Sequence, residues 1–370
     1  MDIVLINKKT VRKNKALKLA QKAAKRRYGR VRGVAPKAKI PKIVMLKNED
    51  ALSFVPGKTV QKESDTLKLD QQSLIAAVRE AALNGLSGSG FPTSRKLESL
   101  AASQAKAKYF IVNAVECEPG LLHDEWILEH LRDDVKYGIR FLKKCFSFSG
   151  VFLAAKTDCA SVATEYQYVR VPSRYPMGQE KLLIKSVLGM ELSNEAIPAE
   201  KGVLVLNIQT VLAIGELIKG VVPASRYMTA ADLSDGSAFV VQAEMGAPIS
   251  EIAQRLFPEK KEFYVGSGVM SAHLMADDEK VNASTCFIGC GSLPDYESAS
   301  KCKGCGGCSR FCPMKLDVKG IIRALEKGKT GGFEAFHTEN CIGCGSCTYI
   351  CAAGKNIQNM IAKINEDRAL

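Results

Sequence analysis

Eight of the 13 cysteines fall in two runs with the same internal spacing, and this pattern constrains the fold more than any other feature of the sequence. In each run three cysteines are separated by two residues, and a fourth follows after three more. The first run is Cys302, Cys305, Cys308 and Cys312, and the second is Cys341, Cys344, Cys347 and Cys351. This spacing is typical of a domain that holds two [4Fe–4S] clusters, in which the fourth cysteine of each run ligates the other cluster.

We therefore predict that each cluster takes three cysteines from one run and one from the other. One set is Cys302, Cys305, Cys308 and Cys351, and the other is Cys341, Cys344, Cys347 and Cys312. Glycines between the cysteines let backbone N–H groups approach the sulfur atoms and allow positive φ. A zinc ribbon is the alternative for paired Cys-x2-Cys motifs. Two complete runs, with Pro313 after the first, favour iron–sulfur clusters and predict an α-rich two-cluster ferredoxin module over residues 293–360.

Apolar strands and helices alternate in the preceding part of the chain. Buried-type strands are expected at Tyr109–Val112, Val151–Ala155 and Val203–Leu206, and helices at Gln71–Leu83 and Thr210–Lys219. This alternation predicts a mostly parallel sheet flanked by helices. We expect a Rossmann-like α/β domain over residues 60–235.

Two segments of this domain have the composition of a ligand site. Gly85, Gly88 and Gly90 form a loop that can bring bare backbone N–H groups against a phosphate or a flavin ring. The loop follows a helix rather than a strand, so the dinucleotide-binding fingerprint does not apply, and a helix C-cap that needs no ligand is the alternative. The segment Asn113–Gly120 follows a strand, and ligands bind at such strand ends in α/β folds.

Four blocks of the chain carry a family resemblance. Residues 85–96, 113–120, 175–184 and 203–210 resemble, in the same order, the C subunit of the Rnf electron-transport complex. That family is similar in turn to the flavin- and NADH-binding subunit of respiratory complex I. The resemblance runs from about residue 70 to about residue 355 and includes the two cysteine runs.

The resemblance implies an FMN and NADH pocket. In it, the glycine loop lies against FMN, Phe91 stacks on a nucleotide base, and Lys96 reaches the FMN phosphate or ring. The other implied pocket residues are Asn113, Glu116, Gly178, Glu180, Asn207 and Thr210, with Asn207 and Thr210 at the FMN phosphate and Glu116 and Glu180 as the catalytic carboxylates.

The implied function is that of an NADH-dependent oxidoreductase subunit, which passes electrons between NADH, via FMN, and a partner protein through two [4Fe–4S] clusters. Ser87 and Gln179 depart from the family pattern. These departures leave open a pure iron–sulfur relay or docking subunit without a working flavin or NADH site. A redox sensor is a third hypothesis, and no DNA-binding motif supports it.

Residues 236–292 resemble the β-grasp unit of the same family, with a strand at Ser237–Ala243 and a helix ending at Leu256. Five cysteines lie outside the cluster runs. We expect Cys145 and Cys159 in the core, Cys286 and Cys290 half-buried, and no chemistry for Cys117. The four histidines show no ligand spacing.

The basicity of the chain is confined to an N-terminal arm. Residues 1–47 hold 16 Lys and Arg against one acid, Asp2, so of the total charge of +13 only −2 remains for residues 48–370. Residues 8–42 are expected to dock on an acidic partner or an anionic membrane surface, or to form a solvated tail; nucleic-acid binding is not expected. Without an apolar run of about 18 residues, we expect a cytoplasmic protein, peripheral to a membrane or in a microcompartment.

Overall fold

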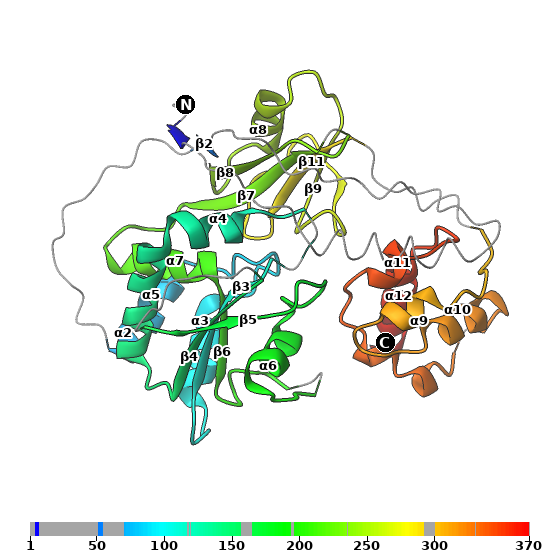
Figure 1. The fold of residues 1–370 in the computed structure, drawn as a ribbon, viewed down its shortest axis with the longest axis horizontal. Coiled ribbons are helices and arrows are strands. Elements are labelled where there is room, and N and C mark those ends of the chain that lie inside the picture. The colour runs from blue at the N-terminus through cyan, green and yellow to red at the C-terminus, as the bar shows by residue number, and fades with distance from the viewer. Residues whose placement is uncertain are drawn as a thin grey trace. The chain divides into compact units, whose positions relative to one another are not determined.

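The computed structural model describes residues 4–6, 51–54, 70–116, 118, 120–156, 165–193, 196–234, 236–291, 300–329 and 331–369. The chain divides into two compact units. The first unit contains two sheets and the second contains both cysteine runs (Figure 1). The predicted docking segment, residues 8–42, lies outside the described residues, as do Cys117 and Cys159.

The first sheet has four strands in the order β5-β4-β3-β6, and all its pairs are parallel. The strands are β3 (Tyr109–Ala114), β4 (Gly150–Ala155), β5 (Gln167–Arg170) and β6 (Val203–Asn207). The apolar strands β3, β4 and β6 are mostly buried, as strands of a parallel sheet covered by helices require. This sheet confirms the predicted α/β class.

Helices cover both faces of this sheet. They are α2 (Gln71–Glu80), α3 (Thr93–Ala102), α4 (His123–His130), α5 (Arg132–Cys145), α6 (Glu180–Leu188) and α7 (Ile208–Ile218). On one face, Leu183 of α6 packs with Ile111 and Val205. Helices α5 and α7 lie together on the other face, and a Cβ built on Gly138 would stand 2.3 Å from the carbonyl oxygen of Val211. Only glycine permits this approach, so Gly138 allows α5 and α7 to pack closely against each other.

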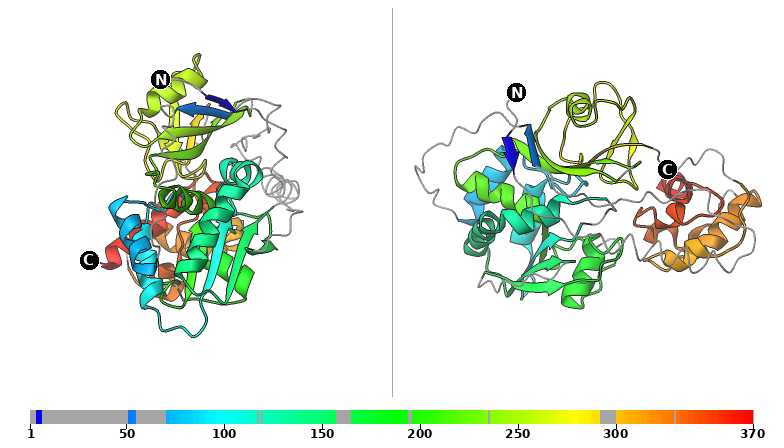
Figure 2. Two further views of the ribbon diagram at one scale, coloured as in Figure 1. Left: turned by 90° about the vertical axis from the view of Figure 1, so that its left-hand side faces the viewer. Right: turned by 45° about the horizontal axis from the view of Figure 1, so that its top comes forward.

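The second sheet of the first unit has the order β1-β2-β8-β7-β11-β9-β10. Its strands are β1 (Val4–Ile6), β2 (Ala51–Phe54), β7 (Ser225–Asp232), β8 (Ala238–Glu244), β9 (Phe263–Gly266), β10 (His273–Leu274) and β11 (Phe287–Cys290). Helix α8 (Ile249–Leu256) covers one face (Figures 1 and 2).

Two details of this sheet differ from expectation. Strand β7 precedes the expected boundary at residue 236, yet it pairs with β8 and β11, so the second sheet takes in residues from Ser225 onward. Cys286 and Cys290 are 1% and 0% exposed rather than half-buried, because β11 is a central strand between β7 and β9.

The second unit is built from two similar halves. Its helices are α9 (Gly307–Phe311), α10 (Val318–Glu326), α11 (Ser346–Tyr349) and α12 (Ile357–Ala369), with 3-10 turns η1 (Glu334–Phe336) and η2 (Thr338–Asn340). Each residue of the first cysteine run has a counterpart 39 positions later. Ser309 accepts a hydrogen bond from the N–H of Lys319, and its counterpart Thr348 accepts one from Gln358, both at 2.8 Å. The repeat is therefore structural as well as sequential.

None of the described helices combines the length and the apolar character needed to cross a bilayer.

Candidate functional site

Two cavities in the second unit collect the eight cysteines of the two runs. The first cavity is lined by Cys302, Cys305, Cys308 and Cys351. The second cavity is lined by Cys312, Cys341, Cys344 and Cys347. Each cavity thus receives one cysteine from the other run, which is the arrangement that a two-cluster module needs.

The backbone around both cavities suits sulfur ligands that surround a cluster. Gly304, Gly306, Gly343 and Gly345 all have φ between 63° and 72°, and the N–H of Gly304 points to Cys302 Sγ at 3.4 Å. Burial raises the pKa of the Cys347 thiol to about 12, so a thiolate at this position requires a bound cationic group. No compact group of His, Cys, Asp or Glu suited to a single metal ion occurs in the part of the chain that the structure describes. Four cysteines line each cavity, which is the number of thiolates that a [4Fe–4S] cluster takes.

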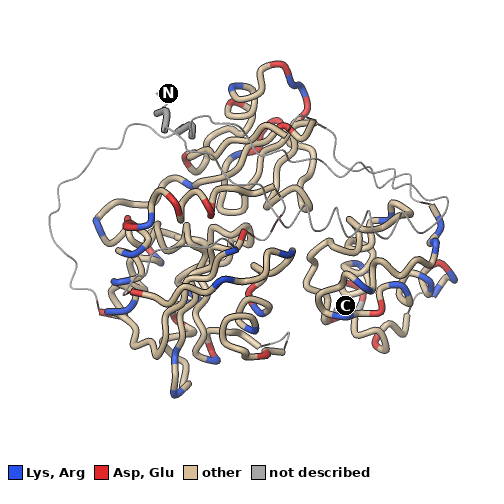
Figure 3. Tube along the Cα trace, viewed as in Figure 1, with Lys and Arg blue, Asp and Glu red and all other residues tan. Residues whose placement is uncertain are grey.

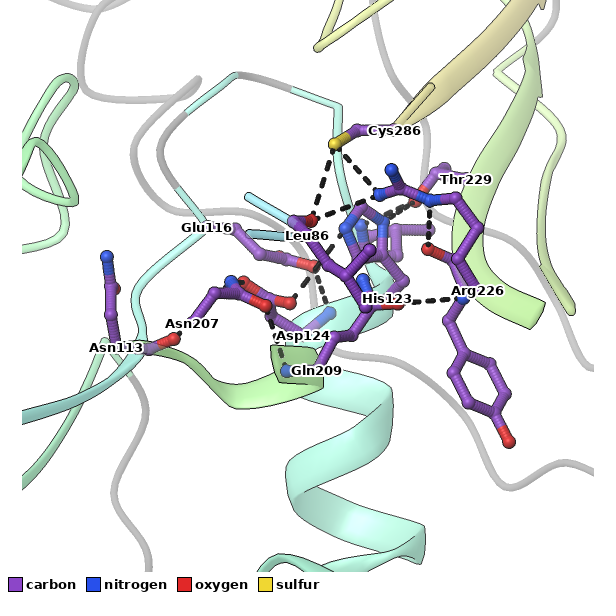
Figure 4. A network of polar contacts seen from close by, with 12 residues as sticks. Leu86, Asn113, Glu116, His123, Asp124, Asn207, Gln209, Arg226, Thr229 and Cys286 are labelled. Carbon is purple, nitrogen blue, oxygen red and sulfur yellow. Dashed lines mark hydrogen bonds and ion pairs between the residues drawn. The ribbon is translucent and has the colours of Figure 1, made fainter. Parts of the chain in front are cut away.

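Two asparagines meet at the carboxyl edge of the first sheet (Figure 4). Asn113 and Asn207 are register partners on β3 and β6. The amide of Asn113 donates to the Gly178 carbonyl at 2.9 Å, and the amide of Asn207 donates to Asp124 Oδ2 at 2.8 Å. The fold therefore brings together three of the expected pocket residues, Asn113, Gly178 and Asn207.

An ion pair lies at the same edge of the sheet. Lys96 Nζ contacts both carboxylate oxygens of Glu180, at 2.9 and 3.0 Å, and the Val205 carbonyl at 3.3 Å. The two side chains are 25% and 31% exposed, so both remain accessible from solvent. In this position the lysine and the carboxylate can each give up their mutual contact and bind a polar group of a ligand instead.

The glycine loop presents unpaired donors. The backbone N–H groups of residues 87–91 make no hydrogen bond of standard geometry with any described residue. Gly88 and Gly90 have φ of 100° and 61°, and Phe91 at the end of the loop is 44% exposed. Consecutive free N–H groups form an anion-binding concavity. Thr210, by contrast, is buried and accepts from the N–H of Leu86 at 3.1 Å, so its hydroxyl anchors the loop in this structure.

A buried polar network beneath this edge was not expected from the sequence (Figure 4). The N–H of Asp124 donates to Glu116 Oε1 at 2.9 Å, and His123 Nδ1 lies 3.1 Å from the Thr229 hydroxyl. The four side chains come from the end of β3, from α4 and from β7. Sequence spacing does not reveal them because the two sheets meet only in the folded chain.

Arg226 joins the second sheet to the glycine loop. It is 1% exposed, and its guanidinium donates to the Leu86 carbonyl at 3.1 Å and to Cys286 Sγ at 3.0 Å. It also donates to the carbonyls of Asn282 and Ala283. Arg226 is therefore a clamp in the sense that its hydrogen bonds fix the base of the glycine loop to the second sheet.

Burial raises the pKa of both carboxyl groups of the network. Burial, assisted by the charge of Asp124, raises the pKa of Glu116 well above its usual range. Burial also raises the pKa of Asp124 to about 6, and it lowers the pKa of His123 to about 3. Asp124 Oδ1 has no hydrogen-bond partner among the described residues. The site therefore holds two adjacent carboxyl groups beside a neutral histidine.

Replacing Asp124 by asparagine is expected to change how stability depends on pH. A carboxyl whose pKa is higher in the folded than in the unfolded chain stabilises the fold at low pH, and this contribution is lost as pH rises through the folded pKa of about 6. Wild-type protein should therefore lose about 1 kcal/mol relative to Asp124→Asn between pH 5 and 7.5. Anaerobic thermal melts of both proteins measure the difference. His123 has a lowered pKa and so an opposite dependence of stability on pH, but this contribution is common to both proteins and cancels. A constant gap between the two proteins would show that Asp124 is already ionised at pH 5.

Comparison with known proteins defines the class of the chain. Residues 78–216 match the Nuo51 FMN-binding domain, and residues 294–352 match a 4Fe-4S dicluster domain. The fold agrees with a solved NAD+-reducing [NiFe]-hydrogenase in the H2-reduced state, with a TM-score of 0.55 and 16% identity over 81% of this chain and 62% of that one. The chain thus joins an FMN-binding type of domain to a dicluster domain.

The curated relatives to which the chain is similar are C subunits of Rnf-type complexes. The C subunit of the ion-translocating oxidoreductase complex of Pseudomonas aeruginosa is 28% identical over 66% of this chain and 33% of the relative. The C subunit of the Na(+)-translocating ferredoxin:NAD(+) oxidoreductase complex of Acetobacterium woodii is 26% identical over 70% of this chain and 62% of the relative. The chain therefore spans between one third and just under two thirds of the length of these two relatives.

Proposed function

We propose that this chain is the electron-transfer subunit of a redox complex and passes electrons between NADH, via FMN, and a partner protein through two [4Fe–4S] clusters. One observation carries the proposal: two cavities, each lined by four cysteines drawn from both runs, occur on the same chain as an FMN-binding type of domain. Clusters of this kind transfer single electrons. When bound, FMN supplies the exchange between hydride and single-electron chemistry.

The residues at the edge of the first sheet fit such a flavin site. The free N–H groups of the glycine loop suit the oxygens of a phosphate or a ring carbonyl. Lys96 supplies a positive charge that a phosphate can share with Glu180. Burial raises the pKa of Glu116, which favours a neutral carboxyl at this end of the sheet. Exposed Phe91 offers a face on which a nucleotide base can stack.

The use of NADH and the setting of the complex belong to the same proposal. The name of the Acetobacterium woodii relative includes ferredoxin and NAD(+), and that of the hydrogenase includes NAD+. We extend this chemistry to the present chain. We also propose that it works in the cytoplasm, peripheral to a membrane complex or in a microcompartment, with redox partner proteins and with residues 8–42 as the docking segment for an acidic partner or an anionic membrane surface.

A second candidate is an iron–sulfur relay without a flavin or NADH site. Specific contacts favour it: Lys96 and Glu180 already satisfy each other, and the hydroxyl of Thr210 is occupied by the glycine loop. In that case the first unit serves as a docking scaffold, and electrons arrive from another protein. The flavin content of purified protein separates the two functions.

Replacing Glu180 by alanine is expected to lower NADH oxidation with an artificial acceptor at least about tenfold, while the iron content stays unchanged. The reason is that Lys96 loses its partner at the edge where hydride transfer is proposed. Glu98→Ala is the matched control, because Glu98 forms an exposed ion pair with Arg79 on the surface of the same domain. Full activity of Glu180→Ala, with FMN retained, would remove Glu180 from the pocket.

A further inference from the structure

The two cluster cavities are built from equivalent positions but carry different charges. The lining residues of the two cavities correspond to each other through a shift of 39 positions, forward from the first half of the repeat and backward from the second half. At three of these positions the first cavity has a lysine where the second has an uncharged residue. The pairs are Lys303 and Ile342, Lys319 and Gln358, and Lys355 and Leu316.

A fourth cation follows the same pattern. A Cβ built on Gly304, in the loop of the first cavity, would stand 2.8 Å from a guanidinium nitrogen of Arg323. The counterpart of Arg323 is Ala362. At the equivalent Gly343, the nearest group to a Cβ is the neutral amide of Gln358, at 3.9 Å.

One acidic residue offsets part of this charge. Glu326 pairs with Lys355 at 2.8 Å and accepts a hydrogen bond from the N–H of Cys302 at 2.8 Å. Lys303 and Lys319 form no ion pair with any described residue, so their charges are uncompensated. No charged residue lines the second cavity. Figure 3 shows the blue Lys and Arg positions along this unit.

We infer that the cluster in the first cavity has the higher reduction potential of the two. A single electron in the module therefore resides mainly on this cluster. This inference rests on the proposed function, because it requires both clusters. Reduction adds one negative charge to a cluster that is already anionic through its four thiolates, and nearby cations favour the reduced form. The lysines therefore make the first cavity the electron acceptor of the pair.

The transfer is balanced without another reactant. One electron leaves the cluster in the second cavity, which is oxidised from the 1+ to the 2+ state. The same electron enters the cluster in the first cavity, which is reduced from 2+ to 1+. No proton or bond changes place.

The magnitude follows from the exposure of the lysines. Lys303 is exposed and Lys319 and Lys355 are partly exposed, so their charges act through a high effective dielectric and each shifts the electron distribution only a few-fold. Together they should favour the first cavity about tenfold, and a tenfold preference corresponds to about 59 mV for a one-electron couple.

The repeat supplies the test variants. Lys303→Ile with Lys319→Gln installs the residues of the second cavity in the first, and Ile342→Lys with Gln358→Lys does the reverse. The control is Lys327→Gln with Lys363→Gln, which removes the same charge from residues that line neither cavity. Each protein is purified anaerobically with its clusters, analysed for iron, and titrated potentiometrically with detection by electron paramagnetic resonance.

We expect two reduction steps in the wild-type protein. Lys303→Ile with Lys319→Gln should lower the reduction potential of the upper step by an amount that corresponds to a several-fold change in electron occupancy. The potential of the lower step should stay unchanged. Ile342→Lys with Gln358→Lys should raise the lower step, and the control pair should move neither. If neutralising the first cavity shifted the lower step instead, or no step at all, the inference would be overturned while the two-cluster function stood. A protein without two clusters by iron analysis would overturn the function and the inference together.

Discussion

Replacing Cys312 by alanine is expected to abolish the [4Fe–4S] cluster of the cavity that is otherwise lined by the second cysteine run. The reason is that Cys312 belongs to the first run in sequence but lines the second cavity together with Cys341, Cys344 and Cys347. The fully reduced protein should then show one [4Fe–4S] spin system instead of two, with iron below the value of about eight for two clusters. Spin quantitation by electron paramagnetic resonance and iron analysis measure the change.

Double replacements assign the lost cluster. Cys312→Ala combined with Cys341→Ala should remove no more clusters than Cys341→Ala alone, because both residues serve the second cavity. Cys312→Ala combined with Cys302→Ala should remove both clusters, because Cys302 lines the first cavity. Cys145→Ala is the control, since Cys145 ends helix α5 in the first unit. If Cys312→Ala and Cys302→Ala affected the same cluster, each run would hold a cluster by itself and the cross-ligation would be wrong.

Replacing Arg226 by methionine is expected to cost about 3–5 kcal/mol of folding stability, because it removes a fully buried cation from its acceptors. The Leu86 carbonyl and the Cys286 thiol lose their donor, and the charge on Asp124 loses its buried counterion. The loss should also free the base of the glycine loop. Chemical denaturation of the first unit, followed by the fluorescence of Trp126, measures the stability. The flavin content of the purified variant shows whether the loop still binds the cofactor.

Two variants make the outcome interpretable. Arg226→Lys keeps the charge but not the fork of donors, so it should recover part of the stability and little of the flavin binding. Arg140→Met removes an exposed arginine that pairs with Glu165 and should cost below about 1 kcal/mol. Wild-type stability in Arg226→Met would contradict the role of Arg226 as a clamp between the second sheet and the loop.

The sequence predicts the elements whose signal is local. The strands at β3, β4 and β6 begin and end within two residues of their expected bounds, because buried parallel strands are short continuous apolar runs. Strand β5 (Gln167–Arg170) was not predicted, since it lies at the sheet edge and has polar ends. Helix α2 ends at Glu80, before the expected Leu83, because Ala82 adopts a φ of 47° that a helix excludes.

The candidate sites divide in the same way. The cysteine spacing is a local pattern with a known three-dimensional consequence, and the structure brings each fourth cysteine to the opposite cavity. The network around Asp124 depends instead on contacts between α4 and strand β7, about one hundred residues apart. No local pattern encodes such a contact. The sequence predicts no role for His123 for the same reason, because its partner, Thr229, lies on the second sheet.

The most direct test of the proposed function is an absorbance spectrum of anaerobically purified protein, with iron and FMN quantified, before and after addition of NADH. We expect about eight irons and one FMN for each chain, with bleaching of both the flavin and the iron–sulfur absorbance by NADH. About eight irons without flavin, and no response to NADH, would contradict the flavin and NADH assignment and leave a two-cluster relay that another protein must reduce.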